Sequence, residues 1–109
     1  MTRSERLRVY TKQWESAARL LRGPASAAAD EKLAAYLLGR DVLAEEPQLS
    51  ETVRVLDLRF AEALAAASGA WWRRVTRISI RCGFYSSPWW QSILRAAVEE
   101  PVALQKAAG

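Results

Sequence analysis

An amphipathic helix is most evident in residues 2–24, which read TRSERLRVYTKQWESAARLLRGP. Apolar side chains recur there every three or four residues, which places them on one stripe of a helix. The stripe consists of Leu7, Tyr10, Trp14, Ala17 and Leu21. Thr2 and Glu5 have the spacing of a capping box at the start of the helix. At its end, Gly23 is expected to take the left-handed conformation and Pro24 to stop the helix.

Further helices are predicted along the chain, separated by serine, glycine and proline. Ser26 can cap a second helix, which Gly39 either ends or interrupts. A third helix is predicted from about Ser50. Its apolar stripe consists of Leu49, Val53, Leu56, Phe60, Leu64 and Ala67. The pair Ser87-Pro88 predicts the start of the last helix, and the residues after Pro101 are expected to add a further turn or two.

Residues 71–82 fit either a helix or a strand. In a helix, the apolar side chains lie on one side and the arginines on another, whereas β-branched residues such as Val75 and Ile80 favour a strand. We favour the helix because no second strand is predicted elsewhere for it to pair with. The sequence therefore predicts an all-α fold. We expect one domain, residues 1–109, folded as a compact bundle of four to five helices.

The composition excludes several classes of function. The chain has 109 residues, no histidine and the single cysteine Cys82. A catalytic triad, a Cys-His pair, a zinc finger and an internal disulfide are therefore all excluded. The five glycines are scattered and form no phosphate-binding loop. We predict a protein that is not an enzyme, with no catalytic residue, no cofactor and no metal.

The net charge of +4 hides an uneven distribution. Residues 1–22 are basic, residues 23–69 hold eight acids against four basic residues, and residues 70–95 hold five arginines and no acid. The interpretation that we favour is that oppositely charged helices neutralise one another within the molecule. The alternative is a basic surface for an acidic partner.

Two adjacent tryptophan pairs, Trp71-Trp72 and Trp89-Trp90, flank most of this acid-free segment. Neighbouring residues on a helix point about 100° apart, so one member of each pair is expected to face the core and the other its edge or the surface. Tryptophan, tyrosine and arginine dominate interface hot spots. We therefore predict a protein-binding surface here, and a homodimer; the alternative is that the tryptophans complete the core. The candidate partner-binding residues are Trp71, Trp72, Arg73, Arg74, Arg77, Arg81, Phe84, Tyr85, Trp89 and Trp90.

Nucleic acid is the second candidate partner. The basic segment Arg73–Arg81 places arginines beside aromatic residues, a combination that contacts phosphates and stacks on bases. A short basic helix could also act as a recognition helix of a DNA-binding transcriptional regulator. The acidic middle of the chain argues against this alternative.

The cellular setting is predicted from the same composition. The charged first residues contain no apolar signal core, no stretch approaches about 18 apolar residues, and one cysteine suits a reducing compartment. We expect a cytoplasmic protein with no membrane partner. Arginine outnumbers lysine 13 to 3 and alanine is abundant, which is typical of a GC-rich bacterial genome.

In size, helicity, lack of catalytic residues and aromatic-apolar surface, the chain resembles the small cytoplasmic bacterial antiactivators of quorum sensing, the QslA-like proteins. Proteins of that kind bind a transcription regulator and block its dimerisation or its DNA binding. The resemblance implies an inhibitor that acts on transcription by binding a protein. It is a resemblance of type, not of motif, and it transfers no individual residue.

Overall fold

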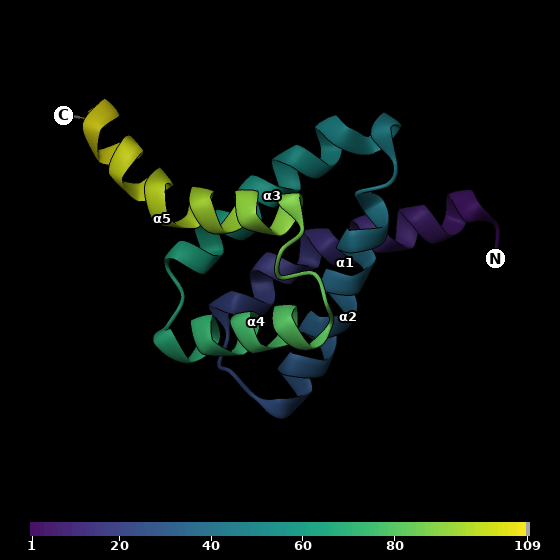
Figure 1. Ribbon diagram of the computed structural model, residues 1–109, viewed down its shortest axis with the longest axis horizontal. Helices are drawn as coiled ribbons and strands as arrows, with labels where there is room; N and C mark the ends of the chain where they lie inside the picture. Colours follow the sequence, from purple (N-terminus) through teal and green to yellow (C-terminus); the bar gives the residue numbers. More distant parts are fainter. Residues whose placement is uncertain (109) are drawn as a thin grey trace.

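The computed structural model describes the backbone of residues 1–108 and the side chains of residues 1–99 (Figure 1). This part of the chain forms α1 (Arg3–Arg22), α2 (Ala27–Leu43), the 3-10 helix η1 (Pro47–Leu49), α3 (Ser50–Ala65), α4 (Gly69–Arg81) and α5 (Pro88–Ala108). Residues 1–108 contain no strand, so the all-α prediction is confirmed. The preference for a helix over residues 71–82 is confirmed too, and the strand alternative is wrong.

The predicted starts of α1 and α2 are confirmed by their caps, and a third cap begins α4. The hydroxyls of Thr2, Ser26 and Ser68 accept hydrogen bonds from backbone N–H groups three residues further on, at the starts of α1, α2 and α4. Gly23 does end α1, but the left-handed conformation expected there is wrong: Gly23 is extended, with φ −95° and ψ 179°. Pro24 favours an extended conformation in the residue that precedes it, which accounts for this difference.

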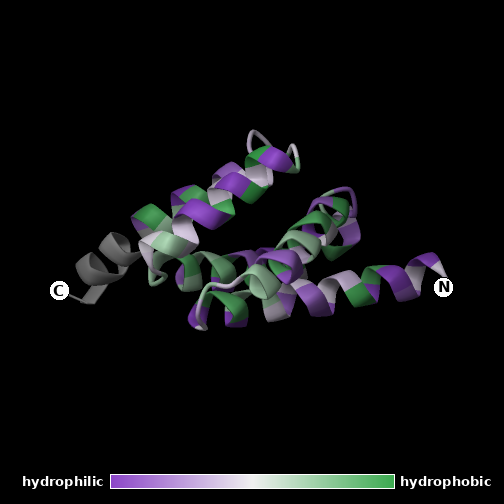
Figure 2. Ribbon diagram, turned by 90° about the horizontal axis from the view of Figure 1, so that it is seen from below, coloured by the Kyte–Doolittle hydropathy of each residue, from purple (hydrophilic) through white to green (hydrophobic). Residues whose placement is uncertain are grey.

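The helices α1, α2, α3 and α5 pack at close range, with α1 between α2 and α3 and with α5 on α3 (Figure 1). At the crossing of α1 and α2, Gly39 lies inside α2 and lets the Tyr10 ring approach the backbone, where an added Cβ would meet the ring at 3.0 Å. The first turns of α1, with several hydrophilic residues, project beyond the rest of the molecule (Figure 2).

The core is centred on a cluster of five aromatic rings from α1, α3, α5 and the α4–α5 loop. Its members are Trp14, Phe60, Phe84, Trp89 and Trp90. Trp14 stacks on Phe60 with ring centroids 4.6 Å apart, and Phe84 stacks on Trp89 at 5.2 Å. Rings of this size bury a large apolar area, so a short chain can build a continuous core from them.

A buried polar network crosses the same core. Arg40 on α2 is only 5% exposed and forms two hydrogen bonds, of 2.7 and 2.8 Å, to the carboxylate of Asp57 on α3. The indole N–H of Trp14 donates to the same carboxylate at 2.9 Å. The guanidinium carbon of Arg40 also lies 4.7 Å from the centroid of the Trp89 ring. Because a buried charge must be paired, this network ties α1, α2, α3 and α5 together.

Candidate functional site

The candidate partner-binding residues divide between the core and the surface. Trp71, Phe84, Trp89 and Trp90 are buried, Trp72 and Arg74 are half-buried, and Arg73, Arg77, Arg81 and Tyr85 are exposed. In this conformation the four buried rings offer no contact surface. The surface that we predicted is therefore restricted to its exposed and half-buried members.

The two tryptophan pairs behave differently. In the first pair Trp71 is buried and Trp72 lies at the edge of the core, as predicted. In the second pair the same prediction is wrong, because both members are buried. The start of α5 lies between two other helices: the Trp89 indole donates to Asp41 on α2 at 2.8 Å, and the Trp90 ring lies 6.3 Å from Phe60 on α3. The side chains of Trp89 and Trp90 point about 100° apart, and both therefore lie in the core.

The loop after α4 separates Phe84 from Tyr85. Gly83 has φ +83°, its N–H donates to the carbonyl of Ile80, and the N–H of Phe84 donates to the carbonyl of Ser79. This is a Schellman motif, in which a left-handed glycine reverses the chain at a helix end. The reversal turns Phe84 into the aromatic cluster and leaves Tyr85 43% exposed.

The outward side of α4 carries a continuous basic face, formed by Arg73, Arg77, Ile80 and Arg81, which we call the α4 basic face. The three arginines recur every four residues and are all exposed, and Ile80 among them is 62% exposed. None of the three forms an ion pair within 4.0 Å with a described side chain. The opposite side of α4 is anchored by Trp71, Val75 and Ile78, all buried.

Arg74 has a different role from the rest of the basic segment. Its guanidinium lies 2.5 Å from the carboxylate of Asp30 on α2, and both side chains are about 30% exposed. Arg3 pairs with Glu46 as well, so basic flanks do meet the acidic middle of the chain. Internal neutralisation therefore accounts for part of the charge distribution, and the arginines of the α4 basic face are among those that form no ion pair with a described side chain.

Sequence reasoning missed the residues of the buried network, although a signal for them was present. Arg40 follows Leu33 and Leu37 at helical spacing and so lies on the buried stripe of α2. An arginine on such a stripe requires a carboxylate on a neighbouring helix. The sequence does not show which acid that is, because the choice of Asp57 depends on how α2 and α3 pack.

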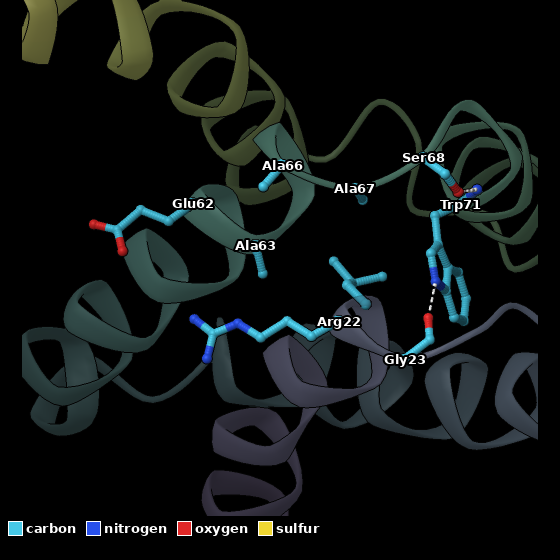
Figure 3. Close-up of a pocket in the computed structure, with 9 residues that line it drawn as sticks. Arg22, Gly23, Glu62, Ala63, Ala66, Ala67, Ser68 and Trp71 are labelled. Carbon is cyan, nitrogen blue, oxygen red and sulfur yellow. Dashed lines mark hydrogen bonds between the residues drawn. The ribbon is translucent and has the colours of Figure 1, made fainter.

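A hollow of about 430 Å³ lies where the ends of α1 and α3 meet the start of α4 (Figure 3). Alanines of the α3 end form one wall, and the Trp71 indole, which donates to the carbonyl of Gly23 at 2.9 Å, forms another. The charged side chains at its rim, Arg22 and Glu62, are exposed. Among the described side chains that line the hollow, none is a buried polar group without a partner, and we assign it no ligand.

Searches for relatives find no match to this chain among protein-family models, curated proteins or solved structures. Within the described residues, no group of three or more His, Cys, Asp or Glu side chains is arranged to hold a metal ion. In the same part of the chain, none of the helices combines the length and the apolarity needed to cross a membrane.

Proposed function

We propose that this protein is a non-enzymatic binding module that recognises an acidic protein partner through the α4 basic face. The observation that supports the proposal is the arrangement of Arg73, Arg77 and Arg81 on one exposed stripe without carboxylate partners among the described side chains. Arginines arranged in this way attract a complementary acidic surface and orient it during association.

The apolar side chains around the arginines favour a protein as the partner. Ile80 is 62% exposed within the face, and Tyr85 is 43% exposed in the loop that follows α4. Trp72, next to Arg73 in the sequence, is half-buried. Protein interfaces combine apolar and aromatic anchors with a polar rim. The resemblance to the antiactivators suggests a transcription regulator as this partner and inhibition as the outcome, and we propose a cytoplasmic location on the composition of the chain.

A pull-down from a bacterial lysate tests the proposal with two matched variants. The variant Arg73→Ser/Arg77→Ser/Arg81→Ser removes the charges of the α4 basic face, and Arg6→Ser/Arg8→Ser/Arg19→Ser removes three exposed arginines from α1. We expect the amount of a captured acidic protein to fall at least tenfold with the first variant and to stay unchanged with the second. If both variants capture it equally, the α4 basic face is not the binding surface.

A DNA-binding transcriptional regulator is the second candidate function, because the same three arginines could contact phosphates. Three phosphate contacts predict that affinity for duplex DNA falls on the order of 40-fold between 50 and 200 mM salt. Fluorescence anisotropy with a random duplex, using the same two triple variants, measures this dependence. Duplex binding that needs the α4 arginines and falls this steeply with salt would favour DNA over an acidic protein; no binding at 50 mM salt would remove this candidate.

A further inference from the structure

The outward side of α2 is the chemical complement of the α4 basic face. Glu31, Leu38 and Val42 lie on one stripe of α2, at spacings of seven and four residues, and Glu45 lies in the turn directly after the helix ends at Leu43. We call these four residues the α2 acidic face. Leu38 and Val42 are 46% and 44% exposed at its middle, with exposed glutamates at both ends. Neither glutamate forms an ion pair with a described side chain.

The two faces lie on neighbouring helices of the same molecule. The ion pair between Asp30 of α2 and Arg74 of α4 joins these helices. The residues next to this pair in sequence, Glu31 and Arg73, belong to the two outward faces and are both exposed. A contact that repeats itself around a two-fold axis needs complementary patches on one molecule, and these two faces meet that condition.

We propose that a second copy of this chain covers these faces, with the α4 basic face of each protomer on the α2 acidic face of its partner. The arginines then meet the glutamates, and Ile80 meets the apolar pair Leu38 and Val42. A two-fold arrangement forms this contact twice and closes the assembly as a dimer. The inference needs no other protein and does not rest on the proposed function. Since the dimer covers the α4 basic face, the monomer is the form that binds an acidic partner.

Charge reversal tests the arrangement with purified protein. One variant, Arg73→Glu/Arg77→Glu/Arg81→Glu, makes both faces acidic, and another, Glu31→Arg/Glu45→Arg, makes both faces basic. We expect the wild type to sediment at twice 12.2 kDa and each variant alone as a monomer. An equimolar mixture of the two variants restores attraction at both contacts and is expected to sediment as a heterodimer. The variant Glu51→Arg/Glu62→Arg, on the exposed side of α3, serves as the matched control and stays dimeric.

Several results would overturn the inference, provided that circular dichroism shows each variant to be folded. They are a wild type that stays monomeric up to about millimolar concentration, assemblies larger than a dimer, or a mixture that remains monomeric. Dissociation of the α3 control to the same extent would also overturn it, because the effect would then be one of net charge. None of these measurements involves a partner from the cell, so failure here and failure of the proposed function are distinguishable.

Discussion

Arginine has different roles in two regions of this molecule, the core and the surface of α4. At the centre, Arg40 is buried against Asp57 and the Trp89 ring, and its position is fixed by hydrogen bonds to another helix. On α4, Arg73, Arg77 and Arg81 extend from an exposed face and form no ion pair with a described carboxylate. The presence of an arginine in the sequence therefore does not by itself identify a surface. The rotational position of the residue on its helix decides whether it stabilises the fold or remains available to a partner.

The largest expected effect comes from removing the central acid. Asp57→Ala leaves Arg40 buried without its counter-charge, and we expect the free energy of unfolding to fall by about 3–5 kcal/mol in urea denaturation. The matched control is Glu62→Ala on the exposed side of the same helix, which is expected to change stability by less than about 0.5 kcal/mol. Equal effects of the two substitutions would mean that the buried network is not what distinguishes the centre from the surface.

The helices themselves were predictable from the sequence, and their neighbours were not. For α1 and α3 the apolar period gives the position and the rotational phase of the helix, and it correctly placed Trp14 in the core. The same pattern left residues 71–82 open between a helix and a strand. Sequence patterns do not show how many other helices pack around each helix. Trp90 and Trp89 are both buried because α5 begins between α2 and α3, a fact of tertiary packing. The burial of Arg40 was visible as a position on a stripe, but its partner was not.

Two core tryptophans offer a finer test of what hydrogen bonds add to aromatic packing. The indole N–H of Trp14 donates to Asp57, whereas the indole N–H of Trp90 is buried with no partner among the described residues. Replacement by phenylalanine removes a similar volume at each site. We expect Trp14→Phe to cost about 1.5–3 kcal/mol more than Trp90→Phe, because only the first substitution breaks a hydrogen bond to a charged group. Comparable urea midpoints for the two variants would contradict this assignment.

A smaller effect is expected where α4 begins. Ser68 caps the helix by accepting a hydrogen bond from the backbone N–H of Trp71 at 3.3 Å. Ser68→Ala is expected to cost about 1 kcal/mol and to speed amide exchange in the first turn of α4. Ser92→Ala, an exposed serine inside α5, provides the comparison and should leave amide exchange in α4 unchanged. An unchanged exchange rate in Ser68→Ala would show that tertiary packing, not the cap, sets the start of α4.

The smallest effect separates the two roles of arginine within α4 itself. Arg74 pairs with the half-buried Asp30, so Arg74→Ala is expected to cost up to about 1 kcal/mol of stability. Arg77 lies three residues further along and forms no ion pair with a described carboxylate. Arg77→Ala should leave the free energy of unfolding in urea within about 0.5 kcal/mol of wild type. An arginine that contributes nothing to the stability of the fold is free to serve binding alone. If Arg77→Ala instead destabilised the protein as much as Arg74→Ala, the α4 basic face would belong to the fold, and the contrast with the buried arginine would disappear.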